Sequence, residues 1–330
     1  MKAVQIEEHG SPNVLKLVEV PIPSIRPDQI LIKIEAIGVN FADIYDRKGT
    51  YSVKLPHILG KEGAGVIVEL GTQVANFAIG DRVGFAYIPK GAYAEYVAVK
   101  PSDLVYLPSD IDSKISAACL LQGLTAYFLT HDTVPLNPNH TILIHGAAGG
   151  VGLLAIQLAK LLGATVIGTV STEAKAELAK QAGADFVIRH DCEDIVKSLM
   201  EFTKNEGVNV VYDSVGAPTF EASLEVLKSH GVLVVFGQSS GIVPILDLNK
   251  HLGRLGKDRG SFFVTRPIIQ HYISNPDNYQ NRASSLFSYI KNGQLKLRIG
   301  DLYDLSSAKL AHEALENRSD RGKFLLIPDI

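Results

Sequence analysis

One short stretch with almost no side-chain bulk constrains this chain more than any other feature. The letters GAAGGVG stand between an apolar run that reads as a strand, TILIH, and a longer apolar run that reads as a helix. At such a turn, backbone N–H groups and the N-terminus of the helix can hold the pyrophosphate of a dinucleotide. A Cβ atom at Gly149, Gly150 or Gly152 would obstruct either the phosphate or the packing of the helix on the sheet.

The spacing of these glycines departs from the strict G-x-G-x-x-G pattern, so tight packing alone is an alternative interpretation. Their place at the first turn of an alternating region favours the dinucleotide site. The expected strands of that region are Thr141–His145, Thr165–Val170, Phe186–Arg189, Val208–Tyr212 and Gly231–Phe236. Segments with helical periodicity separate them, over residues 152–162, 174–182, 195–202 and 218–227. This alternation predicts an α/β fold with a Rossmann-type, doubly wound parallel sheet.

The residues before this region follow a different sequence pattern. Residues 30–36 alternate between apolar and polar, and further short apolar runs follow between turn signals. That pattern predicts a β-rich domain with an antiparallel sheet or a small barrel.

The segment after the alternating region is mixed. We expect helices over residues 283–292 and 306–317, and strands at QLKLRI and KFLLIP. This tail is too short for a core of its own and should return to the first domain. The expected organisation is therefore a catalytic domain over 1–124, a dinucleotide-binding domain over 125–265, and a returning segment over 266–330.

Composition excludes several function classes. The formal net charge is −3, so no global basic field attracts nucleic acid or anionic lipid, and we expect neither as the main partner. We see no apolar signal region at the N-terminus and no window that approaches a membrane span. Two cysteines cannot make a disulfide framework in 330 residues, which suits a reducing cytoplasm.

The end of the second expected strand selects the cofactor. An NAD-binding chain usually carries an acid there for the ribose 2′-OH, whereas this strand ends in Val170 and is followed by Ser171, Thr172 and Lys175. A hydroxyl and an ammonium attract a 2′-phosphate, so we expect NADPH. Glu173 argues the other way. The alternative is that Ser171 caps the helix and Lys175 is only solvated.

Two segments of the first domain, AIGVNFADIYDRKGTY and LGKEGAGVIVELG, carry a family resemblance. With HGAAGGVG, VVYDSVG, FGQSSG, FVTRP and GKFLLIP in the same order, the whole chain resembles the zinc-independent quinone oxidoreductases of the medium-chain dehydrogenase/reductase superfamily, which include zeta-crystallin. The resemblance implies a GroES-like catalytic domain beside the Rossmann domain. It also implies NADPH-dependent hydride transfer to a small soluble quinone.

The same resemblance bears on metal. The zinc alcohol dehydrogenases of this superfamily place a Cys and a Gly-His-Glu motif in those two segments. This chain has Asn40 at the Cys position, Lys61 at the His position and Leu121 at the third ligand position. We therefore expect no metal, and a quinone is electrophilic enough to accept hydride without a Lewis acid.

The resemblance also implies a set of site residues. Asn40, Tyr45 and Tyr51 would be catalytic, by donating hydrogen bonds to the developing charge on the substrate oxygen. His190 replaces a Tyr of the family pattern, and packing or capping is the plain alternative for Asn40 and the tyrosines. The residues expected to contact the cofactor are Asn40, Phe41, Tyr45, Thr125, Gly149, Gly150, Val151, Gly152, Ser171, Thr172, Lys175, His190, Phe236, Gly237, Ser239, Phe263, Val264, Thr265 and Arg318.

Alternative functions remain at this point. The same fold and cofactor serve NADPH-dependent reductases of enones and other activated alkenes, including enoyl thioesters. Zeta-crystallin-like proteins also act without turnover, as structural or RNA-binding proteins, although the acidity of this chain argues against RNA. On family grounds we expect a homodimer that pairs edge strands near residues 260–265.

Overall fold

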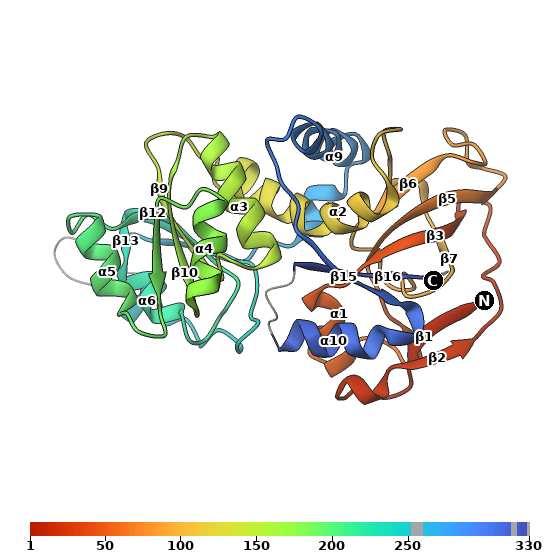
Figure 1. The fold of residues 1–330 in the computed structure, drawn as a ribbon, viewed down its shortest axis with the longest axis horizontal. Helices are drawn as coiled ribbons and strands as arrows, with labels where there is room; N and C mark the ends of the chain where they lie inside the picture. The colour runs from red at the N-terminus through yellow and green to blue at the C-terminus, as the bar shows by residue number, and fades with distance from the viewer. Residues whose placement is uncertain (252–259, 318–321, 329–330) are drawn as a thin grey trace. The chain divides into compact units, whose positions relative to one another are not determined.

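The computed structural model describes residues 1–251, 260–317 and 322–328 (Figure 1). The chain forms two compact units. Unit 1 contains Met1–Leu124, Tyr272–Asn292 and Lys296–Ile330, and unit 2 contains Thr125–His271 and Gly293–Leu295.

Unit 2 is built on a parallel sheet with the strand order β11-β10-β9-β12-β13-β14. The predicted Rossmann-type parallel sheet is thereby confirmed. In Figure 1, α3 and α5 lie on either side of these strands. The bounds are β9 Thr141–His145, β10 Thr165–Val170, β11 Phe186–Arg189, β12 Val208–Asp213, β13 Leu227–Val235 and β14 Phe263–Thr265. The helices are α3 Gly150–Leu161, α4 Glu173–Gln181, α5 Ile195–Phe202, α6 Phe220–Glu225, α7 Leu248–His251 and α8 Ile269–Ile273.

Burial explains why these strands form. The central strands β9 and β12 are covered on both faces, so most of their residues are buried and many of them are Val, Ile or Leu. Gly163 has φ of 82° and ends α3, as a residue in the left-handed region commonly does. One prediction was wrong: Leu227 was expected on the helix before β13, but α6 ends at Glu225 and Leu227 begins the strand.

Unit 1 contains two sheets. The smaller has the order β2-β1-β4, and the larger has the order β15-β16-β3-β5-β6-β8, with β7 pairing with β3. Its strand bounds are β1 Lys2–Ile6, β2 Lys16–Glu19, β3 Ile30–Gly38, β4 His57–Ile58, β5 Glu62–Leu70, β6 Arg82–Phe85, β7 Tyr96–Val99, β8 Leu104–Tyr106, β15 Ile299–Asp304 and β16 Lys323–Ile327. The helices are α1 Phe41–Lys48, α9 Pro276–Lys291 and α10 Ala308–Glu316, and α2 Ser113–Phe128 crosses the boundary between the units. The expected antiparallel pairing is seen along β3, β5, β6 and β8.

The returning segment departs from the prediction in two places. QLKLRI was expected as a strand, but β15 begins only at its last residue, Ile299, and pairs parallel with β16. Its apolar alternation reflects a buried Leu295 after the turn at Gly293, rather than a strand. Helix α9 begins at Pro276, earlier than expected, because the Asn275 side chain accepts the Asn278 N–H and Pro occupies the first helical position.

No helix among the described residues is both long and apolar enough to cross a membrane.

Candidate active site

The glycines after β9 divide into two roles. Gly149 is the N-cap of α3 and Gly150 its first residue, and both are exposed. Gly152 is buried, and a Cβ there would lie 2.5 Å from the Gly146 carbonyl oxygen and 2.8 Å from that of Ala147. Gly150 thus keeps the helix N-terminus accessible, and Gly152 lets the helix approach the loop. This arrangement fits a pyrophosphate.

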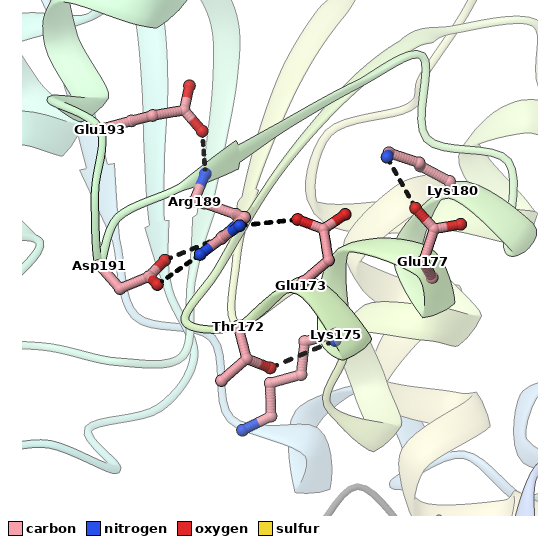
Figure 2. A network of polar contacts seen from close by, with 8 residues as sticks. All are labelled: Thr172, Glu173, Lys175, Glu177, Lys180, Arg189, Asp191 and Glu193. Atoms are coloured by element: carbon pink, nitrogen blue, oxygen red, sulfur yellow. Dashed lines mark hydrogen bonds and ion pairs between the residues drawn. The ribbon is translucent and has the colours of Figure 1, made fainter.

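The end of β10 presents a hydroxyl and an ammonium. The Nζ atom of half-buried Lys175 lies 3.5 Å from Oγ of Ser171. The Thr172 side chain caps α4 by accepting the Lys175 backbone N–H, so the alternative in which Ser171 is the cap is wrong. Figure 2 shows the Glu173 carboxylate turned toward Arg189, while Lys175 extends to the other side of the helix start. The Lys175 ammonium, which lies near Ser171, therefore extends away from the nearby acid.

Sequence reasoning missed Asp213, the last residue of β12, which holds the turn after this strand by hydrogen bonds. Its buried carboxylate accepts hydrogen bonds from the N–H groups of Val215 and Gly216, at 2.7 and 3.0 Å, and from Oγ1 of Thr219 at 2.7 Å. The loop after β13 is bonded to the turn so formed, through the Ser239 N–H and the Ser214 carbonyl. An acid at a strand end, in the letters VYDSVG, was the available signal.

The remaining predicted cofactor residues of unit 2 lie at three places. Phe236, Gly237 and Ser239 are half-buried in the loop after β13. Phe263, Val264 and Thr265 form β14, the edge strand of the parallel sheet. His190 follows β11, is exposed, and donates its backbone N–H to Val170.

Thr125 is half-buried on α2, at the start of unit 2. Arg318 lies outside the described residues.

His145, at the end of β9, is fully buried beside this edge. Its Nδ1 lies 2.8 Å from Oγ1 of Thr169, and burial lowers its pKa to about 4. The imidazole is therefore neutral at pH 7 and serves as an uncharged packing group.

In unit 1, the predicted catalytic residues gather around α1. Asn40 is the N-cap of this helix, and its backbone N–H donates to Oδ2 of Asp43 at 2.8 Å. Half-buried Tyr45 contacts Tyr51 edge to face with 5.1 Å between ring centroids, and lies 6.4 Å from the Phe41 ring. The structure thus brings Phe41, Tyr45 and Tyr51 together as one aromatic cluster.

The Asn40 side chain is engaged inside the protein. The Nζ of Lys323 lies 2.6 Å from the Asn40 Oδ1, and because an ammonium only donates, this contact fixes the orientation of the amide. The Asn40 Nδ2 then donates to Glu62 Oε2 at 2.9 Å and to the Gly38 carbonyl at 3.1 Å. Both amide hydrogens therefore have internal acceptors.

Lys323 and Glu62 complete this buried triad. Their Nζ and Oε2 atoms are 2.7 Å apart, and Oε1 of Glu62 accepts the Leu121 backbone N–H at 2.6 Å. Sequence reasoning missed Lys323. It stands in the closing GKFLLIP, and its charge within a buried strand was the available signal.

The ligand positions of the zinc relatives do not fit a zinc ion in this chain. Asn40 is bonded to Lys323, Lys61 forms an ion pair with Asp46 at 2.7 Å, and Leu121 offers no side-chain donor. The Glu62 carboxylate could otherwise bind a cation, but it is paired with the Lys323 ammonium. Within the part of the chain that the structure describes, no three His, Cys, Asp or Glu residues are placed to hold a metal ion.

A directed chain of hydrogen bonds continues from α1 to α10. Arg47 can only donate, so its Nη1, 3.0 Å from Nδ1 of His312, makes that nitrogen the acceptor. Nε2–H of His312 then donates to the Tyr93 hydroxyl at 3.0 Å, and this hydroxyl donates to Asp43 Oδ2 at 3.2 Å. Burial and the Arg47 charge lower the pKa of His312 to about 3, consistent with the neutral tautomer.

Two family models match the chain. Residues 26–109 match the alcohol dehydrogenase GroES-like domain, and residues 150–275 match the zinc-binding dehydrogenase.

Curated relatives align along the whole length. Quinone oxidoreductase 1 of Escherichia coli K12 is 42% identical, with 98% of this chain and 99% of the relative covered. Quinone oxidoreductase of Pseudomonas aeruginosa is 40% identical, with 99% of each covered. The 2-haloacrylate reductase of a Burkholderia species is 36% identical, with 99% and 98% covered.

Solved structures give the same result. The E. coli quinone oxidoreductase complexed with NADPH matches with a TM-score of 0.94 at 40% identity, covering 99% of this chain and 100% of that one. The predicted α/β fold with a GroES-like domain is confirmed, and the chain belongs to the quinone oxidoreductase family of the medium-chain dehydrogenases/reductases.

Proposed function

We propose that this protein is an NADPH-dependent quinone reductase. The proposal rests on the full-length likeness to a quinone oxidoreductase solved with NADPH. The end of β10 agrees with this cofactor, because Ser171 and Lys175 stand there in place of an acid. When bound, NADPH supplies the hydride, and the protein supplies orientation and electrostatics.

Unit 2 provides the cofactor site in this proposal. The exposed backbone of Gly149 and Gly150, with neighbouring Val151, receives the pyrophosphate at the start of α3. Ser171 and Lys175 bind the 2′-phosphate. The loop after β13, held by the Asp213 turn, contacts the nicotinamide half through Phe236, Gly237 and Ser239, which Phe263–Thr265 supplement.

Unit 1 provides the groups that meet the substrate. The hydroxyls of Tyr45 and Tyr51 are the proposed donors to the oxygen on which charge develops. We infer a different role for Asn40 from that of a donor to the substrate, because both its amide hydrogens have internal acceptors. We assign it as a positioning residue that fixes the start of α1 against Lys323, so that the tyrosines are held in place.

The proposed reaction needs no metal. Its support is the set of side chains at the ligand positions, an amide, an ammonium and a leucine, with Lys323 paired to Glu62. Because a quinone is already electrophilic, hydride transfer proceeds without a Lewis acid to polarise it.

The test follows absorbance at 340 nm with chelator-treated protein. NADPH and NADH are each paired with 1,4-benzoquinone and with an enone, beside controls without protein. We expect NADPH to be consumed faster than NADH, fastest with the quinone, and equally with or without chelator. Loss of activity on chelation, restored by zinc, would refute the metal-free reaction. Tyr45→Phe and Tyr51→Phe test the donors, and the loss of one hydroxyl should lower kcat by about 100- to 1000-fold.

A second candidate is an NADPH-dependent reductase of activated alkenes. It is favoured by the likeness to the 2-haloacrylate reductase, which is 36% identical over nearly the whole chain. Turnover of the enone without turnover of the quinone would select it. Tight NADPH binding without turnover of either substrate would instead favour a non-catalytic role.

We also propose a homodimer formed through β14. This strand is the edge of the parallel sheet and carries Phe263 with 59% exposure. Ile242, Ile245 and Leu248 of the preceding segment are exposed as well, at 73, 93 and 63%. Among the described strands β14 is outermost, and an edge strand with an exposed apolar side chain is suited to pairing with a second copy. Cys119 and Cys192 are both free thiols, which suits the proposed cytoplasmic location.

A further inference from the structure

Arg189, the last residue of β11, binds two acids that border the proposed 2′-phosphate site. Its Nη1 lies 2.7 Å from Glu173 Oε2, and its Nη2 lies 2.8 Å from Asp191 Oδ2. A third bond, from Nε to Asp191 Oδ1 at 3.3 Å, makes the contact with Asp191 bidentate. Figure 2 shows the guanidinium between the two carboxylates.

The contact of Glu173 with Arg189 explains how NADPH can bind although an acid lies next to the proposed 2′-phosphate site. Glu173 is the first residue of α4, and Lys175 follows it two positions later. Turned toward Lys175, the carboxylate would neutralise the ammonium and repel a phosphate that carries nearly two negative charges. The contact with Arg189 turns it the opposite way and offsets its charge.

The balance of charge beside the proposed 2′-phosphate site depends on Arg189. Glu173, Asp191 and Glu193 contribute three negative charges, and Glu193 accepts the Arg189 backbone N–H at 2.9 Å. Arg189 and Lys175 contribute two positive charges. Without Arg189, Lys175 would be the one cation left among these described residues to balance three carboxylates, and the strand end would attract a 2′-phosphate less.

We propose that Arg189 is a positioning residue for cofactor selectivity, which acts by holding Glu173 and Asp191 away from the 2′-phosphate that Ser171 and Lys175 bind. The inference rests on the proposed function, since it concerns the same cofactor. Arg189 acts through the two acids, and its guanidinium is already engaged by them.

The exposure of these groups makes the proposal accessible to mutation. The Arg189 side chain is 31% exposed and that of Glu173 is 62% exposed. Ion pairs at such exposure contribute little to stability, so substitutions here should leave the protein folded. An effect on binding can therefore be separated from an effect on folding.

The experiment measures binding of 2′,5′-ADP and of 5′-AMP by calorimetry at low salt, with thermal melts to verify folding. Arg189→Gln should weaken 2′,5′-ADP binding by about tenfold and leave 5′-AMP unchanged. Adding Glu173→Gln and Asp191→Asn to Arg189→Gln should restore 2′,5′-ADP affinity to within about threefold of the unmodified protein. Lys180→Gln is the matched control, because it removes one exposed cation of α4 that pairs with Glu177 instead.

The acid substitutions decide the outcome. If they restore affinity, Arg189 acts by holding the acids, as proposed. If the triple variant stays as weak as Arg189→Gln, the guanidinium contacts the phosphate itself and the positioning role is refuted. If the unmodified protein binds 2′,5′-ADP no better than 5′-AMP, the choice of NADPH fails and this inference fails with it. An effect of Lys180→Gln equal to that of Arg189→Gln would also refute it, because general charge would then suffice.

Discussion

The ammonium of Lys323 lies 2.7 Å from the carboxylate of Glu62, and both side chains are almost fully buried in unit 1. Lys323 begins β16, Glu62 begins β5, and Asn40 joins them from the start of α1. An ion pair and two hydrogen bonds therefore connect β16, β5 and α1, which are distant in sequence. The stability of the protein depends on the charge balance of these three side chains, because a buried ion without its partner is costly.

Replacing Lys323 should show this dependence. Lys323→Met leaves the Glu62 carboxylate buried without its cation, and we expect the free energy of unfolding to fall by about 3–5 kcal/mol. The double variant Lys323→Met/Glu62→Gln should lose less than the single variant, because neither position then carries an unpaired charge. Urea unfolding measures both, with Lys309→Ala as a control in an exposed pair. A double variant less stable than Lys323→Met would contradict this account.

The buried carboxyl group of Asp43 should make stability depend on pH. Burial raises its pKa to about 7, despite the opposing charge of Lys61. Its pKa in the unfolded chain is about 3.9, so the folded state binds more protons between pH 4 and 7. In this window the contribution of Asp43 to the unfolding free energy decreases as pH rises.

Asp43→Asn removes this titration. We expect the unfolding free energy of the variant to fall less between pH 4 and pH 7 than that of the unmodified protein. Urea unfolding at pH 4.5, 5.5 and 7 measures the difference, and Asp28→Asn, at an exposed site, serves as the control. Parallel curves for the variant and the unmodified protein would show that Asp43 has no raised pKa.

The two glycine roles at the start of α3 can be separated. Gly152→Ala places a Cβ 2.5 Å from a backbone oxygen, and we expect it to lower the unfolding free energy by about 1–3 kcal/mol. Gly150→Ala is at an exposed helix position, so it should preserve stability and yet weaken NADPH binding, where its methyl group meets the phosphate. Thermal melts and NADPH titration distinguish the two. Unchanged NADPH affinity in Gly150→Ala would place the pyrophosphate elsewhere.

Short-range patterns made most of unit 2 predictable. β9, β10 and β11 have the bounds expected from the sequence, because each is a compact apolar run between a helix and a polar turn. Leu227 was misplaced because its apolar spacing fits the end of α6 as well as the start of β13. Only pairing with Val208 on β12 decides between them.

Long-range pairing made the candidate site harder to predict. Asn40 was chosen from its motif, but its actual partners, Glu62 and Lys323, lie 22 and 283 positions away. No local pattern reports such a contact. Arg189 was missed for a related reason, because its role comes from Glu173, which is brought close only when β10 and β11 pair.

The proposed homodimer gives a last prediction. Phe263 is exposed on the edge strand β14, so a charge there would be buried if two copies pair along this edge. We expect Phe263→Lys to shift the mass measured by light scattering from dimer toward monomer, and Ile245→Lys to have a similar effect. Ile79→Lys, on an exposed apolar residue of unit 1, is the matched control and should leave the mass unchanged. A dimer that survives both substitutions at the edge would have to form through another surface, since neither lysine could be buried there without a partner.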